Sequence, residues 1–269
     1  MKAVILAGGK GSRISEESRY KPKPLINIAG KPIIWHIMKL YSFYGVDEFI
    51  ICCGYKGHLI KEYFVNYNAT EHDNVYFLQE QKQIRVEELT LLNNSRYNKE
   101  HFKITLVDTG LETLTAGRLL KVRKYLENEE QFYLTYGDGV ADIDLNALHH
   151  FHNKHGKCVT ITTCEQEERF GTMKFKPDDV VVDCFKEKKK STGTYINAGF
   201  MVMNHEIFDY LGNGEEMLED GPFEALAANG EMAAYLHKGF WSPMDTLKEQ
   251  MYLDMLAKGG EAPWMLWNN

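Results

Sequence analysis

The chain alternates between short apolar runs and longer segments in which apolar residues recur every three or four positions. The apolar runs are continuous, which predicts strands covered on both faces, as in a parallel sheet. The first run, Ala3 to Ala7, leads directly into a glycine-rich stretch. Later strands are predicted over residues 49–53, 75–78, 104–107, 132–136, 159–163, 180–185 and 199–203.

The segments between the runs have helical spacing, as in Pro32 to Tyr44, where apolar residues recur three and four positions apart. Further helices are predicted over residues 59–67, 116–127, 145–154, 223–229 and 246–258. Alternating strands and helices indicate an α/β fold: a doubly wound, mostly parallel, Rossmann-like sheet flanked by helices. The last helix predicts a small C-terminal helical/β extension.

The sequence contains no internal repeat, low-complexity segment or linker, so one domain spanning residues 1–269 is predicted. The polar stretch Leu92 to Phe102 is interpreted as a surface insertion.

Composition and charge exclude several classes of function. Hydrophobic residues make up 44% of the 269 and charged residues 26%, as in ordinary globular proteins. The formal net charge is -7, and the densest basic cluster, Lys186 to Lys190, is interpreted as a solvated loop face. No stretch is basic enough to predict nucleic acid as a partner.

The cysteines and the N-terminus bear on the cellular location. The five cysteines are odd in number and form no C-x-x-C pair, so neither a disulfide framework nor a zinc site is indicated. Reduced thiols are typical of the cytoplasm. The N-terminal apolar run is too short for a signal peptide, and no run reaches the roughly 20 apolar residues of a membrane span. We therefore expect a cytoplasmic protein with no membrane partner.

A glycine loop after the first predicted strand is the first candidate for chemistry. Gly8, Gly9 and Gly11 let backbone N–H groups approach a phosphate or a base, and Arg13 follows. The dinucleotide fingerprint is excluded because its third glycine would fall at Ile14, and the P-loop pattern is absent as well. Three glycines followed by an arginine favour a functional loop of another kind over an ordinary one.

Lys21-Pro22-Lys23-Pro24 follows the loop. The two prolines stiffen the chain, so that a lysine can be held beside phosphate oxygens. Taken alone, the segment is explained better by a solvated turn.

Together, the stretch Leu6 to Arg13 and the segment Lys21 to Pro24 resemble the signature of the sugar-phosphate nucleotidyltransferase family. Within that family the chain resembles the glucose-1-phosphate cytidylyltransferases. This narrower resemblance rests on Trp35 to Met38, Ile50 to Gly57, Leu106 to Gly110, Tyr136 to Asp142, Arg169 to Gly171, Gly239 to Thr246 and Ala262 to Trp264. It covers nearly the whole chain in order, and it implies a GT-A-type fold.

The resemblance implies transfer of CMP from CTP to a sugar 1-phosphate, above all α-D-glucose 1-phosphate, with CDP-glucose and pyrophosphate as products. It also implies Mg²⁺ as cofactor and a homo-oligomer. Such a reaction brings two anions together, so positioning and charge neutralisation must supply most of the catalysis.

The resemblance further assigns roles to residues. Lys23, Arg13 and Asp138 match the catalytic group, and Asp138 with Asp245 matches the pair of metal ligands. The implied nucleotide contacts are Leu6, Ala7, Gly8, Gly9, Gly11, Ser12, Thr109, Arg118 and Gly137. A cation on a helix face would explain Arg118 equally well.

The implied acceptor residues are Glu187, Lys188, Asn197 and Gly199. Lys189 stands where the family has a proline, so this segment departs from the pattern while the triphosphate residues are intact. A different sugar phosphate or a polyol phosphate is therefore an open alternative for the acceptor.

Other classes of protein would explain parts of the sequence. Asp142-Ile143-Asp144 matches the D-x-D of metal-dependent glycosyltransferases, and a nucleotide sensor would need only the glycine loop. The retained aspartates favour catalysis over sensing. Structural roles are predicted for the tryptophans Trp241, Trp264 and Trp267. A structural role is also predicted for four histidines, which are interpreted as lying on different faces of one helix: His149, His150, His152 and His155.

Overall fold

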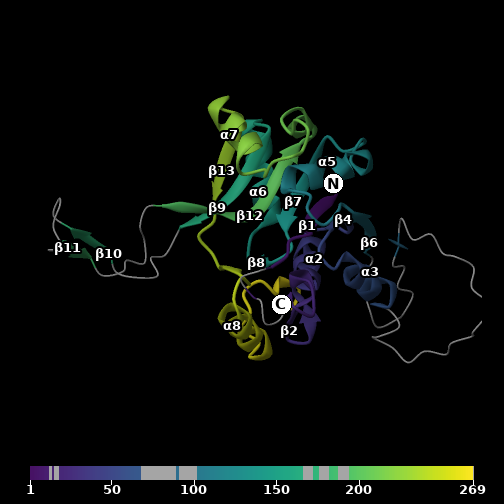
Figure 1. Ribbon diagram of the computed structural model, residues 1–269, viewed down its shortest axis with the longest axis horizontal. Helices are drawn as coiled ribbons and strands as arrows, with labels where there is room; N and C mark the ends of the chain where they lie inside the picture. Colours follow the sequence, from purple (N-terminus) through teal and green to yellow (C-terminus); the bar gives the residue numbers. More distant parts are fainter. Residues whose placement is uncertain are drawn as a thin grey trace, which may run out of the picture.

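A computed structural model describes residues 1–11, 14, 18–67, 89–90, 102–165, 172–175, 182–186 and 194–268. In this part of the chain, helices cover an eight-stranded sheet (Figure 1). In spatial order the strands are β13 (Met232–Leu236), β9 (Val159–Glu165), β12 (Tyr195–Asn204), β7 (Gln131–Tyr136), β1 (Ala3–Ala7), β4 (Glu48–Cys53), β6 (Lys103–Asp108) and β5 (Leu89–Thr90).

Three short pairs of strands lie outside this sheet: β2 (Asn27–Ile28) with β3 (Lys31–Pro32), β8 (Gly139–Ala141) with β14 (Trp241–Pro243), and β10 (Thr172–Phe175) with β11 (Val182–Lys186). The β10–β11 pair lies well away from the main sheet (Figure 1). The α-helices are α2 (Ile33–Phe43), α3 (Gly57–Val65), α5 (Thr115–Val122), α6 (Leu145–His155), α7 (Gly221–Ala228) and α8 (Leu247–Lys258). The 3₁₀ helices are η2 (Lys23–Leu25), η3 (Arg123–Tyr125), η4 (His205–Asp209) and η5 (Leu266–Asn268).

The predicted mostly parallel sheet is confirmed. Strand β1 pairs in parallel with β4 and β7, β4 with β6, and β9 with β13. The sequence pattern did not reveal that β12 runs antiparallel between β7 and β9. The strand predicted over 180–185 overlaps β11, which lies outside the main sheet, and the prediction over 75–78 falls outside the described residues.

Two hydrophobic cores explain the continuous apolar runs. In β1, the side chains of Ala3, Ile5 and Ala7 enter one core, whereas those of Val4 and Leu6 enter the other. Helices α2, α3 and α6 pack into the first core, and α5 and α7 into the second. Every position of the strand is buried, because the sheet is covered on both faces.

The C-terminal segment returns across the ends of the strands. Pro243 of β14 pairs with Gly139 of β8, and α8 then begins with a capping box between Thr246 and Glu249. After α8 the chain packs against α2, where Trp264 is fully buried.

His36 joins this C-terminal segment to the core. Its Nδ1 accepts a hydrogen bond of 3.3 Å from the Trp264 indole, which can only donate. The Nε2 atom therefore carries the proton and donates to the Ile28 carbonyl at 2.9 Å. Burial lowers the pKa of His36 to about 4, so the ring is neutral at physiological pH.

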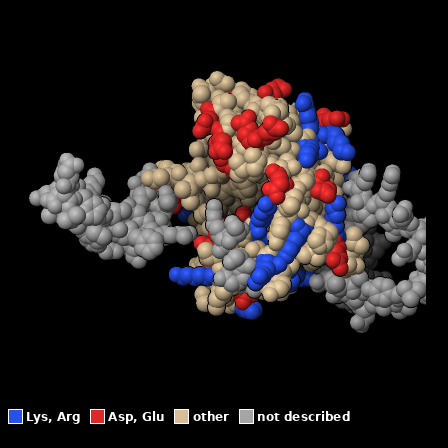
Figure 2. Space-filling model, viewed as in Figure 1, with Lys and Arg blue, Asp and Glu red and all other residues tan. Residues whose placement is uncertain are grey.

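The visible surface carries charges of both signs. Acidic side chains gather around α7, and basic side chains lie over the middle of the same face (Figure 2). Among the helices of the described segments, none has the length and apolar character that crossing a bilayer requires.

Candidate active site

A cavity of about 2040 Å³ opens where β1, β7 and β12 meet the C-terminal segment. It lies beyond the carboxyl ends of the parallel strands, which is where α/β sheets bind ligands. Its lining combines the glycine loop, Lys23, the start of α5, Asp138, the start of β12 and Asp245. Residues from one end of the chain to the other therefore face a single space.

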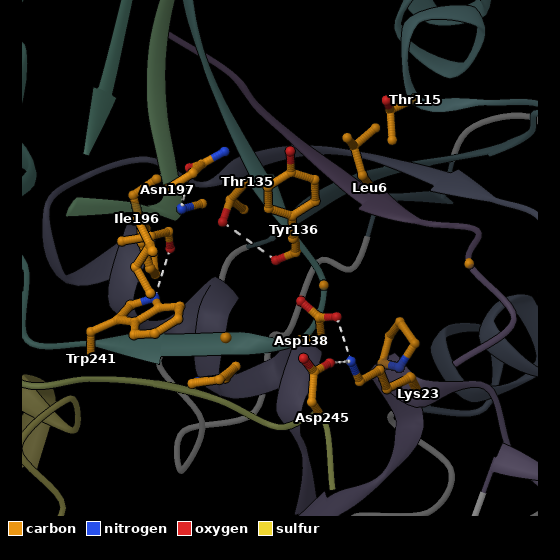
Figure 3. Close-up of a pocket in the computed structure, with 18 of the residues that line it drawn as sticks. Leu6, Lys23, Thr115, Thr135, Tyr136, Asp138, Ile196, Asn197, Trp241 and Asp245 are labelled. Atoms are coloured by element: carbon orange, nitrogen blue, oxygen red, sulfur yellow. Dashed lines mark hydrogen bonds and ion pairs between the residues drawn. The ribbon is translucent and has the colours of Figure 1, made fainter. Parts of the chain in front are cut away.

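Lys23 lies at the floor of this cavity, between two carboxylates (Figure 3). Its ammonium is 2.7 Å from Asp138 Oδ2 and also forms an ion pair with Asp245 Oδ1. Burial alone would lower the pKa of Lys23, but the two aspartates outweigh that effect and raise it. The lysine is held as a fixed cation.

Local sequence explains how each of these three groups is positioned. Lys23 begins the 3₁₀ turn η2 and is 8% exposed, with extended backbone at Pro22 before it. Asp138 follows the last residues of β7. Asp245 is brought to it by the β8–β14 pair, next to which Met244 N donates to the Asp138 carbonyl at 2.8 Å.

The donor set fits a divalent metal ion. Two carboxylates from distant segments already share one cation, and hard oxygen ligands are those that Mg²⁺ and similar ions prefer. In the described part of the chain no group of three or more His, Cys, Asp and Glu side chains is arranged to bind a metal. An ion held by Asp138 and Asp245 would therefore complete its coordination with phosphate and water oxygens.

The predicted nucleotide residues of the glycine loop line the cavity. Leu6, Ala7, Gly8, Gly9 and Gly11 all face it. Gly11 has φ of +62° and lies against the Lys23 side chain, so a left-handed turn brings the loop to the lysine. No Cβ contact would arise at Gly9, whose backbone is open to a ligand.

Gly137 allows a close approach between segments. A Cβ at this position would lie 3.1 Å from Pro24 and 3.3 Å from the Leu6 carbonyl. The amide of Gly137 donates to the same carbonyl at 3.1 Å. Gly137 thus lets η2 pack close to the end of β1, and it also lines the cavity.

Arg118 lies at the base of the glycine loop. Its guanidinium donates to Thr109 Oγ1 at 2.6 Å and to the carbonyls of Gly110 and Gly8 at 2.9 and 3.1 Å. Weaker contacts reach the carbonyls of Cys53 and Leu111. These bonds tie the ends of three neighbouring strands together.

The side chain of Arg118 fills the space that two glycines leave. Gly8 and Gly54 flank the guanidinium, and a Cβ on either would overlap it. Burial lowers the pKa of Arg118, although a guanidinium remains charged in proteins. Arg118 lines the cavity and is only 5% exposed, so it is not a solvated cation on a helix face. Nor does its side chain project freely into the cavity toward a ligand.

Thr109, the other predicted base or ribose contact, lies behind the cavity. It is fully buried, and its hydroxyl donates to the Cys53 carbonyl at 2.7 Å. Its hydrogen bonds support the loop that carries the cavity wall.

On the acceptor side, Asn197 and Gly199 of β12 line the cavity. Asn197 Oδ1 accepts from Gly199 N at 2.8 Å, and the Asn197 side chain also forms a hydrogen bond with the Tyr136 phenol. The indole of Trp241 donates to the Ala198 carbonyl at 2.7 Å, so this predicted structural tryptophan also forms part of the wall. The remaining predicted residues, Arg13, Ser12, Glu187 and Lys188, lie outside the described residues.

The surroundings of Asp142 and Asp144 do not suit the metal site of a D-x-D glycosyltransferase. Asp142 Oδ1 lies 3.0 Å from His237 Nε2. Asp144 caps α6 by accepting from Ala147 N at 3.0 Å. Asp142 Oδ1 is buried and forms no hydrogen bond within the described part of the chain, whereas Asp144 is occupied by its helix cap, and neither carboxylate lines the cavity.

Three of the four histidines of α6 belong to one hydrogen-bond network. The sequence analysis had placed the four on different faces of the helix. His152 and His155 both contact Thr160 Oγ1 at 2.7 Å, and His149 contacts Gln131 at 2.9 Å. Burial lowers the pKa of all three, which suits neutral rings in a hydrogen-bonded support for β9.

Residues 2–257 match the family model described as nucleotidyl transferase. The chain belongs to the nucleotidyl transferase family. This nucleotidyl transferase is 47% identical over 267 residues to proteins of Salmonella typhimurium and Salmonella typhi, each named glucose-1-phosphate cytidylyltransferase. The alignments cover 99% of this chain and 100% of each relative.

Solved structures agree on the fold of this nucleotidyl transferase. The crystal structure of UDP-glucose pyrophosphorylase complexed with UDP-glucose has a TM-score of 0.67 at 16% identity. That match covers 96% of this chain and 98% of the other. At such low identity the likeness shows the fold alone.

Sequence reasoning missed three parts of the site. Tyr136 and Glu219 line the cavity, and Gly54 makes room for the Arg118 guanidinium. Tyr136 directly precedes Gly137-Asp138 and could have been found from that position. Glu219 lies in a loop without periodicity, and only the fold brings it to the cavity.

Proposed function

We propose that the protein transfers CMP from CTP to α-D-glucose 1-phosphate and releases CDP-glucose and pyrophosphate. The observation that carries this proposal is the Lys23 ammonium fixed between Asp138 and Asp245, on the floor of a cavity shared by the glycine loop and Asn197. The full-length similarity to proteins named glucose-1-phosphate cytidylyltransferase supports the choice of both substrates.

In this reaction an oxygen of the sugar phosphate attacks the α-phosphorus of CTP, and the bond to the β-phosphate breaks. Charge builds on the non-bridging oxygens and on the departing pyrophosphate. Lys23 is a cation placed before substrate arrives, so its attraction costs little reorganisation. The glycine loop supplies backbone N–H groups and leaves room for the triphosphate.

We propose Mg²⁺ as the cofactor, held by Asp138 and Asp245. Its chemistry would be to neutralise phosphate charge and to align the triphosphate. The support is the pair of oxygen ligands that converge on one point in the cavity.

The direct test is pyrophosphate release from each of the four common ribonucleoside triphosphates with glucose 1-phosphate and Mg²⁺. Release with CTP, and formation of CDP-glucose by mass spectrometry, are expected. No release with any triphosphate would refute the proposal. Release with CTP only when another sugar phosphate or a polyol phosphate is supplied would favour the alternative acceptor.

Lys23→Gln tests the role of the fixed cation, and Lys21→Gln is its matched control. Both lysines belong to the same Lys-Pro-Lys-Pro segment, but Lys21 is exposed and outside the cavity lining. Loss of one charge-assisted contact at the reacting phosphate should lower kcat by about 100-fold or more in Lys23→Gln. Lys21→Gln should retain activity, and equal losses in both variants would contradict the assignment.

We further propose that residues 1–269 form one cytoplasmic domain that assembles into a homo-oligomer. One sheet runs from β13 to β5, and Cys52, Cys53, Cys158 and Cys164 are free thiols. On α8, Leu247, Met251 and Met255 are exposed at successive four-residue intervals, as is common at a protein interface. Light scattering after size exclusion tests the assembly, and a monomer at micromolar concentration would contradict it.

A further inference from the structure

A tyrosine and a glutamate to which the sequence analysis gave no role lie together in the wall of the cavity. Tyr136 ends β7, two residues before Asp138, and Glu219 lies just before α7. The Tyr136 hydroxyl donates to Glu219 Oε1, and Glu219 Oε2 accepts from Thr115 Oγ1 at 3.3 Å. All three residues line the cavity that holds Lys23 and Asp138.

The fold holds this pair in place from both sides. Gly199 has φ of +84°, and a Cβ there would lie 2.8 Å from Tyr136 Cδ2, so the ring packs on bare backbone of β12. On the other side, Leu218 is fully buried and its amide donates to Thr115 Oγ1 at 2.7 Å. The backbone beside Glu219 is thus anchored while its carboxylate stays exposed.

Charge limits what this part of the cavity can bind. Burial raises the pKa of Tyr136, and the charge of Glu219 raises it further, so the phenol stays protonated and remains a donor. The Glu219 carboxylate repels phosphate and accepts hydrogen bonds from neutral hydroxyls. The cavity must admit two phosphorylated substrates. The Glu219 carboxylate indicates that their phosphate groups bind elsewhere in the cavity.

The strand order favours the acceptor over the nucleotide as the ligand here. The glycine loop follows β1, whereas Asn197 is on β12, which pairs with the other edge of β7. In Figure 3 the Asn197 amide extends toward the side of the cavity on which the Tyr136 hydroxyl lies. Asn197 hydrogen-bonds the Tyr136 phenol, which in turn donates to Glu219, so β12 joins this pair in one network. The exposed Glu219 carboxylate offers an acceptor to the hydroxyl groups of a carbon skeleton.

We propose that Tyr136 and Glu219 form a subsite that recognises hydroxyl groups on the carbon skeleton of the acceptor. This inference rests on the proposed function in one respect, namely that the acceptor is a phosphorylated sugar or polyol. It adds the residues that distinguish one such acceptor from another.

The test compares Tyr136→Phe and Glu219→Gln with the wild type. Glu215→Gln is the matched control, because Glu215 lies on the same segment, bonds Asn213 at 2.9 Å and does not line the cavity. The KM for glucose 1-phosphate should rise about 10- to 100-fold in Glu219→Gln, the range for one lost hydrogen bond to a charged group. The KM for CTP should stay within about twofold in both variants.

Deoxy analogues of glucose 1-phosphate provide the readout that a merely structural role would not change. The wild type should discriminate against at least one monodeoxy analogue, and Glu219→Gln should lose that discrimination. A rise in the KM for CTP alone would assign the pair to the ribose and overturn the proposal. Unchanged KM values and unchanged discrimination would show that the pair only ties β7 to the segment before α7.

Calorimetry separates this proposal from the proposed function. If the wild type turns over no triphosphate with glucose 1-phosphate, the proposed function fails, and binding of glucose 1-phosphate is measured instead. Weaker binding in Glu219→Gln than in Glu215→Gln would still support the subsite. Absence of binding to the wild type, or equal binding in the two variants, would overturn it.

Discussion

The packing of Arg118 against Gly8 gives a prediction that does not depend on knowing the substrates. A methyl group on Gly8 would overlap the guanidinium, and the three nearest atoms all belong to Arg118. The backbone of Gly8 is not in the left-handed region, so the Gly8→Ala substitution adds only the steric conflict with Arg118. To relieve it, the guanidinium must move and give up hydrogen bonds to buried acceptors.

The magnitude follows from those bonds. The loss of two hydrogen bonds from a charged group costs about 3 kcal/mol or more. For a chain of this size, that lowers the melting temperature by about 6 to 12 °C. Gly9→Ala is the matched control, since nothing lies within 4 Å of a Cβ there, and its stability should change by less than about 1 kcal/mol.

A double-mutant cycle isolates the cause. Urea unfolding, followed by tryptophan fluorescence and by far-UV circular dichroism, gives the free energy of unfolding for Gly8→Ala, Arg118→Ala and the double variant. In the Arg118→Ala background the cost of Gly8→Ala should fall below about 0.5 kcal/mol, because the conflicting atoms are gone. An equal cost in both backgrounds would refute the packing argument.

Three further predictions concern pH, metal and packing. His36 has a pKa lowered to about 4, so about 3 kcal/mol of stability, complete above pH 6.5, should be lost as the pH falls toward 4. His36→Gln should flatten the unfolding free energy between pH 6.5 and 5, and an unchanged slope would contradict this. Asp245→Asn should raise the Mg²⁺ concentration for half-maximal activity about tenfold or more, and an unshifted titration would remove Asp245 from the metal site. Gly117→Ala would place a Cβ 2.5 Å from the Gly214 carbonyl. It should lower the free energy of unfolding, measured by thermal unfolding, by about 1 to 3 kcal/mol. An unchanged stability would mean that the loop containing Gly214 moves to make room.

The sequence predicts the inner strands well because burial on both faces leaves a continuous apolar run. The bounds predicted for β1 agree with the structure, and those for β7 differ by one residue. The antiparallel direction of β12 leaves no mark on its own residues, since it depends on where the preceding segments go. Strand β13, Met-Ala-Ala-Tyr-Leu, was not predicted because it contains no β-branched residue and two alanines, which do not favour strands.

For the site, individual residues could be named before their arrangement was known. Lys23, Asp138 and Asp245 were predicted from the family resemblance, whereas their convergence depends on the three-residue pair β8–β14, which is too short to give a periodic signal. The supporting roles of Thr109 and Arg118 follow from burial and from the carbonyls around them. Such surroundings are assembled from several strands, and no single stretch of sequence contains them.

The antiparallel pair β8–β14 has a consequence for biosynthesis. Lys23 and Asp138 precede Asp245 in the chain by more than 100 residues. Asp245 reaches them only after β14 has been made and has paired with β8. During translation, a ribosome-bound chain can build most of the sheet and still lack one of the two carboxylates. The nascent enzyme is therefore expected to be inactive until the segment that contains β14 and Asp245 has left the exit tunnel.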